Sequence, residues 1–308
     1  MQEKQFGLID MMLIGCAVIW GVNVVAIKLA LLQLSPLAFN SLRFIGAASL
    51  SWIVLLWREP GARLDKRDLP KLIWLGILGH TLYQVLFITG TSLTTAGNTS
   101  LLLATIPLWV SVLSGLFGLE QVRVQTWLGL ACSFSGILLV TVGGGKQISF
   151  GQMTARGDLM VLVGALMNAY FTISSKPLLK RYSPLQFNAY TMTAGAIGLL
   201  IFSNQTLRAQ DWSVVGAYGW GGLAFSTVLA IVLGNVIWNS GIKKIGASRT
   251  AVYNNLQPAV AMLASWLILA ENIRLPQILG ACAIIGGLYI TKMTGLPWEK
   301  KATATKEA

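Results

Sequence analysis

Ten long apolar runs follow one another along the chain, and they constrain its fold more than any other feature. They cover residues 8–31, 37–57, 69–90, 96–118, 124–143, 157–177, 184–203, 214–238, 249–270 and 274–293. A bilayer core of roughly 30 Å is crossed by a helix of about 20 apolar residues. Because a segment in lipid must satisfy its own backbone hydrogen bonds, each run predicts a helix. The fold class expected is an all-α membrane protein with ten transmembrane helices.

The composition and the placement of the charges agree with a lipid environment. Apolar residues make up 55% of the 308 residues and charged residues only 11%, against about 25% charged residues in soluble domains. The formal net charge is +12, but the bases lie between the apolar runs and form no single basic face. We therefore expect the lipid bilayer as a partner and no binding to nucleic acid.

The bases of the connecting segments predict the orientation of the chain. If the N-terminus is cytoplasmic, the inside segments hold 17 Lys and Arg residues and the outside segments hold 4. Cytoplasmic loops of membrane proteins carry such an excess of positive charge. We expect a multi-pass protein of the bacterial inner (plasma) membrane with both termini in the cytoplasm, which requires an even number of spans.

The two halves of the chain repeat each other. At an offset of 148 residues, Asp10, Ala17, Lys28 and Ser35-Pro36-Leu37-x-Phe39-Asn40 match Asp158, Ala165, Lys176 and Ser183-Pro184-Leu185-x-Phe187-Asn188; at an offset of 151, Gly90, Ala96, Pro107 and Glu120 match Gly241, Ala247, Pro258 and Glu271. The repeat holds five spans, an odd number, so the second copy enters the membrane from the opposite face. The expected units are 1–146, an inverted copy at 155–293, and a short cytoplasmic tail at 294–308.

Polar and aromatic side chains gather in the middles of six spans. The candidates for substrate binding are Trp20, Asn23, His80, Tyr83, Gln84, Asn98, Trp109, Asn168, Tyr170, Asn235, Trp238 and Asn254; Asn239, Tyr253 and Gln257 accompany them. An amide without a partner in hydrocarbon costs several kcal/mol, so these groups must face one another, backbone or water. Together they suit a pocket for a small organic solute, whereas hydrogen bonds that join helices are the alternative for each residue singly.

Four residues within the spans have a second interpretation each. His80 is the sole histidine; it is a candidate for substrate binding or proton transfer, or a neutral side chain bonded to a neighbouring helix. Pro107 and Pro258 occupy equivalent positions, where they form hinges or harmless kinks. Arg43 lies inside its span, where it either reaches back to the interface or acts at a pocket or gate. One histidine and three scattered cysteines predict no metal site and no cofactor.

Carboxylates are missing from the middle of every span. Asp10 and Asp158 lie near span starts, and Glu120 and Glu271 lie just beyond span ends. Proton-driven pumps keep a carboxylate within the membrane as a relay. The sequence therefore favours a facilitator or exchanger of neutral or zwitterionic solutes, with coupling through His80 as the alternative.

The order of short motifs resembles the drug/metabolite transporter superfamily, and within it the EamA-type ten-helix exporters. The resemblance rests on Trp20-Gly21, the paired Ser-Pro-x-x-Phe-Asn segments, Ala96 and Asn98 leading to Pro107, and Pro258 followed by Leu269-Ala270-Glu271 and Gly280-Ala281. It implies export of small metabolites, amino acids prominent among them, through a cavity lined by spans one, three, four, six, eight and nine. The aromatic residues point by analogy to an exporter of amino acids that include aromatic ones.

Other functions are weighed against this one. A nucleoside, a sugar conjugate or a neutral drug is an alternative cargo. An intramembrane enzyme would need a catalytic constellation that one histidine without a mid-membrane acid does not supply, and the inverted repeat argues against a receptor or scaffold. The expected partner is a small-molecule substrate, and the chain is either a monomer or a homodimer. Two pairs of small residues, Cys132/Gly136 and Ala283/Gly287, predict close helix packing within or between subunits.

Overall fold

The computed structural model describes residues 7–94, 96–119, 122–145, 148, 154–269 and 272–292. All regular secondary structure within these residues is helical. The predicted tail 294–308 and the residues Glu120 and Glu271 lie outside them.

The helices are named in chain order, with α for α-helices and η for short 3₁₀ or π segments. They are α1 (Leu8–Ala30), α2 (Pro36–Arg58), η1 (Lys66–Asp68), α3 (Leu69–Gly76), η2 (Ile77–Leu82), α4 (Tyr83–Leu93), α5 (Ala96–Leu103), α6 (Ile106–Leu116), α7 (Val124–Gly143), α8 (Ala155–Arg181), α9 (Pro184–Ala209), α10 (Ala217–Phe225), η3 (Ser226–Leu233), α11 (Gly234–Ile245), α12 (Ala247–Val252), η4 (Tyr253–Asn255), α13 (Leu256–Leu269) and α14 (Leu275–Lys292).

These elements form the ten predicted spans. Eight stretches are long and apolar enough to cross a membrane, and a ninth, Leu275–Thr291, is shorter. The remaining span runs from α12 through η4 to α13 and is interrupted in its first half. The predicted fold class of ten transmembrane helices in two inverted repeats is confirmed, because the chain folds into these spans and shares its fold with a solved structure described below.

Three spans continue well beyond the apolar runs predicted. The seventh, predicted to end at residue 203, reaches Ala209. The sixth span continues past Pro177, where the sequence pattern ended it, and reaches Arg181. Leu178 and Leu179 beyond the proline are buried in the core, so packing holds the last turn in place. The eighth span continues to Ile245 rather than ending at Trp238, and its added turns carry Lys243 and Lys244. Charged side chains at a span end leave the lipid while the helix continues.

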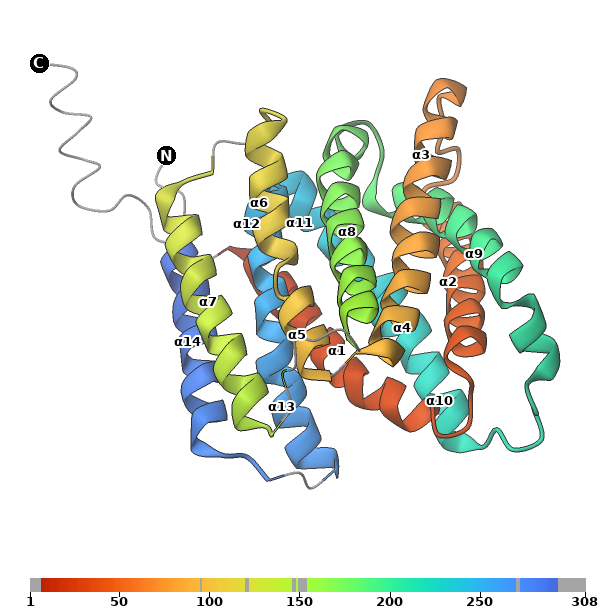
Figure 1. Ribbon diagram of the computed structural model, residues 1–308. Coiled ribbons are helices and arrows are strands. Elements are labelled where there is room, and N and C mark those ends of the chain that lie inside the picture. Colours follow the sequence, from red (N-terminus) through yellow and green to blue (C-terminus); the bar gives the residue numbers. More distant parts are fainter. Residues whose placement is uncertain are drawn as a thin grey trace, which may run out of the picture.

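Two pairs of helices that occupy equivalent positions in the two halves pack against each other. The fifth and tenth spans, α7 and α14, lie side by side and antiparallel at one end of the molecule (Figure 1), and the second and seventh, α2 and α9, pair at the other. In the view of Figure 1, α1 runs down and α8 runs up, as expected for inverted copies. In the α2–α9 pair, the indole of Trp52 donates to Thr193 Oγ1 at 2.9 Å.

Irregular helix occurs in four spans and is paired across the halves. π-Helical turns, η2 and η3, interrupt the third and eighth spans. The fourth span breaks between α5 and α6 ahead of Pro107, and the ninth breaks at η4 ahead of Pro258. Irregular backbone at membrane depth persists only where protein or a wet cavity satisfies it, and π-turns often mark functional sites. The four irregular spans therefore locate the candidate site.

Glycines allow α7 and α14 to approach closely. A Cβ on Gly280 would lie 2.5 Å from the carbonyl oxygen of Gly136, and a Cβ on Gly287 would lie 2.5 Å from that of Gly129. Cys132 Sγ reaches the carbonyl of Ala283 at 3.3 Å in the same interface. The small residues noted in the sequence thus pack within one chain, and the backbones rather than side chains set the helix separation.

Replacing Gly280 by alanine is expected to force these backbones apart. Overpacking of a tight interface costs about 1–3 kcal/mol, so Gly280→Ala should lower the thermal unfolding midpoint of the detergent-solubilised protein. A Cβ on Gly286, which lies on the same helix, would meet no atom within 4 Å. Gly286→Ala therefore serves as the matched control and should leave the midpoint unchanged or higher. Equal midpoints for the two variants would contradict this account.

Candidate functional site

The first cluster of predicted site residues surrounds the π-helical segment η3 of the eighth span. The indole N–H of Trp20 donates to the carbonyl oxygen of Ala230 at 2.8 Å, and its ring lies 5.2 Å from that of Trp238. Asn23 accepts a hydrogen bond from Ser226 Oγ at 2.5 Å. Spans one and eight are thereby joined at the irregular turn, and Trp20 and Trp238 offer adjacent aromatic faces.

The second cluster surrounds η2 of the third span. His80 is buried between Phe44 and Phe171, whose ring centroids lie 5.4 and 5.0 Å from its own. Its Nε2 atom has no hydrogen-bond partner among the described residues. One turn further on, the ring of Tyr83 stacks on Phe87 at 6.0 Å. A buried polar nitrogen without a partner is costly unless a solute or water reaches it.

Arg43 belongs to the second cluster and is buried in the protein. Its side chain is 7% exposed, Nη2 donates to Gln84 Oε1 at 3.3 Å, and its guanidinium lies 5.3 Å from the ring of Phe39 and 5.7 Å from that of Phe44. Its Nε atom lacks a partner among the described residues. The aromatic faces and the amide oxygen stabilise a cation held inside the protein, which agrees with a role within the span rather than at the interface.

Two aspartates tie the first helix of each half to the interrupted span of the other half. Asp158 of α8 accepts from Asn98 Nδ2 at 2.9 Å and from Thr94 Oγ1 at 2.5 Å. Asp10 of α1 accepts a hydrogen bond from the hydroxyl of Tyr253, which lies in η4. Asp10 is buried, with 3% exposure. Because the halves are inverted, these equivalent bonds lie toward opposite ends of the spans.

Gln257 joins the first cluster, because its Nε2 donates to the carbonyl oxygen of Trp20 at 3.4 Å. The remaining candidates for substrate binding do not join the two clusters through a described hydrogen bond or ring contact with their residues. Asn235 bonds to Ile231 of its own helix, and the backbone of Asn168 accepts from Thr172. Trp109 has an indole N–H without a partner in the described part of the chain, while Tyr170 is 37% exposed. Asn254 and Pro258 are half-buried, and Pro107 is buried at the start of α6. In the described ranges, no three His, Cys, Asp or Glu side chains gather as metal ligands would.

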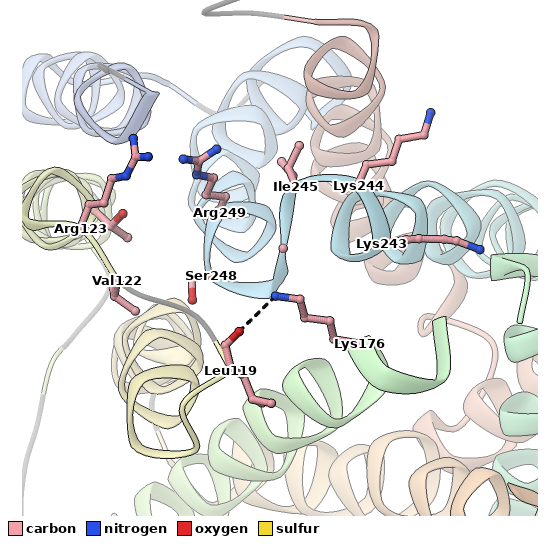
Figure 2. A pocket seen from close by; sticks show the side chains of 11 residues that line it. Leu119, Val122, Arg123, Lys176, Lys243, Lys244, Ile245, Ser248 and Arg249 are labelled. Carbon is pink, nitrogen blue, oxygen red and sulfur yellow. Dashed lines mark hydrogen bonds between the residues drawn. The ribbon is translucent and has the colours of Figure 1, made fainter. Parts of the chain in front are cut away.

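A pocket of about 370 Å³ opens at the end of the molecule that the charge pattern predicts to be cytoplasmic. Its eleven lining residues are Leu119, Val122, Arg123, Thr126, Lys176, Lys243, Lys244, Ile245, Gly246, Ser248 and Arg249. Figure 2 shows Lys176 reaching into the pocket, where Nζ donates to the carbonyl of Leu119 at 3.4 Å. We call this site the basic pocket. Its volume is within the range of small-molecule sites.

Sequence reasoning did not foresee three of these features. The aspartate bonds were foreshadowed only by the repeat, which matched Asp10 with Asp158 without revealing their partners. The bases of the basic pocket lie in separate segments of the sequence, and their convergence depends on how the loops of both halves meet. The π-turns left no recognisable pattern in the sequence.

Ten spans in two inverted halves, with irregular helices paired across them, define a multi-pass membrane protein of the transporter class. A model of the EamA-like transporter family matches residues 7–142 and again residues 155–293. The chain belongs to this family, as the sequence motifs predicted.

Known relatives agree with this assignment. The chain is 30% identical to the uncharacterised transporter YyaM of Bacillus subtilis (strain 168), covering 91% of this chain and 92% of YyaM. It is 28% identical to a probable terminal-alkyne amino-acid exporter of Streptantibioticus cattleyicolor (strain ATCC 35852 / DSM 46488 / JCM 4925 / NBRC 14057 / NRRL 8057), covering 77% of this chain and 76% of that protein. A solved crystal structure, 15% identical, shares the fold with a TM-score of 0.78 over 92% of this chain and 97% of that one.

The bonds at Asp158 predict that replacing Asn98 destabilises the protein more than replacing Asn254, an asparagine of the other interrupted span. Asn98 is fully buried and donates to Asp158, so Asn98→Ala should destabilise the protein by about 1–3 kcal/mol, the cost of a lost buried hydrogen bond to a charged group. Asn254 is half-buried, and Asn254→Ala should change stability by less than about 0.5 kcal/mol. Thermal unfolding midpoints measure both, and a larger loss for Asn254→Ala would refute the distinction.

Proposed function

We propose that the protein exports small metabolites, above all amino acids including aromatic ones, across the bacterial inner membrane by alternating access. The observation that carries this proposal is the pairing of irregular helix in spans three and eight and in spans four and nine. Interrupted helices at equivalent places of inverted repeats are typical of transporter binding sites. The two clusters around His80 and Trp20 lie beside such interruptions.

The aspartate bonds support alternating access. The bond between Asp10 and Tyr253 joins span one to span nine, and the bonds of Asp158 to Asn98 and Thr94 join span six to span four. In the inverted arrangement, one set closes the pathway toward one membrane face and the other set toward the opposite face. The pathway opens toward one face when the bonds of one aspartate break while those of the other aspartate persist. Each set of bonds thus has a formed state and a broken state. Pro107 and Pro258 act as the hinges, and Arg43 with Gln84 as a gate between spans two and three.

The cargo follows from the chemistry of the clusters. Trp20 and Trp238 provide aromatic faces at 5.2 Å. Nitrogens on His80 and Trp109 that have no partner among the described residues remain for hydrogen bonds to a solute. Such a mixture fits a small molecule with a flat apolar part and a few polar groups. An aromatic amino acid has both, and one relative is named as a probable exporter of an amino acid. A nucleoside or another neutral metabolite or drug is the second candidate, because it offers the same two features.

The coupling we propose is facilitated diffusion or exchange. The described carboxylates of spans one and six lie at the span starts and are already hydrogen-bonded within the protein. His80 is the remaining candidate for proton coupling, because it is a titratable group in the middle of a span.

Flux measurements test the proposal. Purified protein in liposomes loaded with labelled tryptophan, phenylalanine or leucine should show saturable efflux that the unlabelled amino acid accelerates from the outside. The absence of saturable flux for every amino acid tested would end the leading proposal, and competition by nucleosides would then identify the alternative. Equal rates with and without a pH gradient support a facilitator or exchanger, and a dependence on the gradient replaces it by proton coupling.

The two clusters predict which variants lose transport. Trp20→Ala and His80→Ala should each reduce the tryptophan flux about 5- to 30-fold, because a lost stacking or hydrogen-bonding contact costs about 1–2 kcal/mol. Trp266 is 50% exposed on the outside of the bundle, so Trp266→Ala is the matched control and should retain the flux. Folded fractions are compared by size-exclusion chromatography. Normal kinetics in both cluster variants would move the binding site elsewhere.

A further inference from the structure

The basic pocket is unusual in its charge. Five of its eleven lining residues are cationic, Arg123, Lys176, Lys243, Lys244 and Arg249, and none of the eleven is acidic. Glu120 follows Leu119 in the chain but lies outside the described residues. Counting its full charge against the pocket would still leave an excess of four positive charges. A concave site lined by one sign of charge concentrates ions of the opposite sign.

Two carboxylates of the described residues at the same end of the molecule are engaged outside the pocket. Arg181 forms ion pairs with Asp65 at 3.0 Å and with Asp68 at 2.5 Å, outside the basic pocket. Hydrogen bonds from the backbone N–H of Arg67 and from the side chain of Arg181 hold the pKa of Asp65 below its usual value. Asp65 therefore stays ionised at neutral pH, and both aspartates pair with Arg181. Neither of these two aspartates therefore neutralises the excess charge of the pocket.

The pocket lies on the seam between the two halves. Arg123 comes from the segment between α6 and α7 of the first half, while Lys176, Lys244 and Arg249 come from α8, α11 and α12 of the second. Figure 2 shows the guanidinium groups of Arg123 and Arg249 on one side of the pocket, whereas the side chains of Lys243 and Lys244 extend away from Ser248. The ammonium group of Lys243 donates to the carbonyl of Tyr182 at 3.1 Å. The hydroxyls of Thr126 and Ser248 also line it. An anion held here would contact both halves that move relative to each other in transport.

We propose that the basic pocket is a docking site for the carboxylate or phosphate group of a small solute on the cytoplasmic side. The site rests on the proposed function in one respect: the docked solute is the transported one, so the cargo carries at least one anionic group. A zwitterionic amino acid satisfies this through its carboxylate. A neutral drug or a free nucleoside does not. Charge in the pocket then contributes to the choice of cargo before the solute reaches the clusters deeper in the membrane.

A cysteine probe measures the field in the pocket without any transport. Val122 is half-buried and lines the pocket, so Val122→Cys is placed in a chain whose Cys16, Cys132 and Cys282 are replaced by alanine. Modification rates are compared for the anionic sulfonatoethyl and the cationic trimethylammonioethyl methanethiosulfonates, each normalised to a free thiol. The anionic reagent should react faster by roughly 10-fold, and 1 M salt should remove most of this preference.

Substitution of two bases tests whether the preference for the anionic reagent arises from the charges of the basic pocket. The double variant Arg123→Gln/Lys244→Gln should bring the two normalised rates close to each other. Lys180 lies on α8 at the same end but does not line the pocket, so Lys180→Gln is the matched control and should retain the preference. A preference that survives the double variant, or that was never present, overturns the proposal.

A protection assay distinguishes a dissolved anion from a lipid headgroup. The Val122→Cys protein is reconstituted in vesicles of phosphatidylcholine, with or without phosphatidylglycerol, and treated with neutral methyl methanethiosulfonate. Inorganic phosphate at constant ionic strength should slow the modification in phosphatidylcholine vesicles. Protection by phosphatidylglycerol together with none by phosphate would assign the pocket to lipid and overturn solute docking.

Transport of paired solutes completes the test and uses the full chain with its cysteines. Arg123→Gln/Lys244→Gln should raise the KM for tryptophan several-fold with little change in kcat, and should not raise the KM for tryptophanamide, which lacks the carboxylate. Equal changes for both solutes would overturn the link between docking and cargo. If no amino acid is transported at all, the proposed function fails, whereas the cysteine rates and phosphate protection still decide whether the pocket holds anions.

Discussion

The requirement that every backbone polar group in lipid find a partner inside the protein shapes the whole structure. Most of the chain meets it with regular helix. The exceptions are the π-turns η2 and η3 and the breaks ahead of Pro107 and Pro258. At these places side chains of other spans provide the partners, as when the indole of Trp20 donates to the carbonyl of Ala230. The irregular turns and the polar clusters are therefore two aspects of one constraint.

Inversion of the two halves places the irregular turns at equivalent positions of both halves. Equivalent spans of the two halves are interrupted, and Asp10 and Asp158 make equivalent bonds to the interrupted spans nine and four. A structure with two equal solutions for its packing can exchange one for the other at small cost. The tight glycine contacts between α7 and α14, by contrast, leave little room for change and mark a rigid part of the bundle.

Several site residues could be named from the sequence, but not their partners. His80 and Arg43 were candidates because charged or titratable groups within spans are rare, and the structure places both against Phe44. Asn98 was a candidate for ligand binding, yet it donates to Asp158, a residue sixty positions away. An amide in a span must have some partner, and hydropathy does not specify which one. Pro177 predicts a helix end, yet the burial of Leu178 and Leu179 keeps α8 helical to Arg181.

The sequence by itself determined the membrane environment, the number of spans and the inversion of the halves, because apolar length and an odd repeat are properties of the chain order alone. It also led to the transporter family through its paired motifs. The tertiary structure decided which polar groups meet. Arg123 and Lys244 belong to different halves and converge on one pocket only when the loops of both halves come together. Charge summed over a sequence predicts orientation, but the field that a solute meets depends on where those charges converge in space.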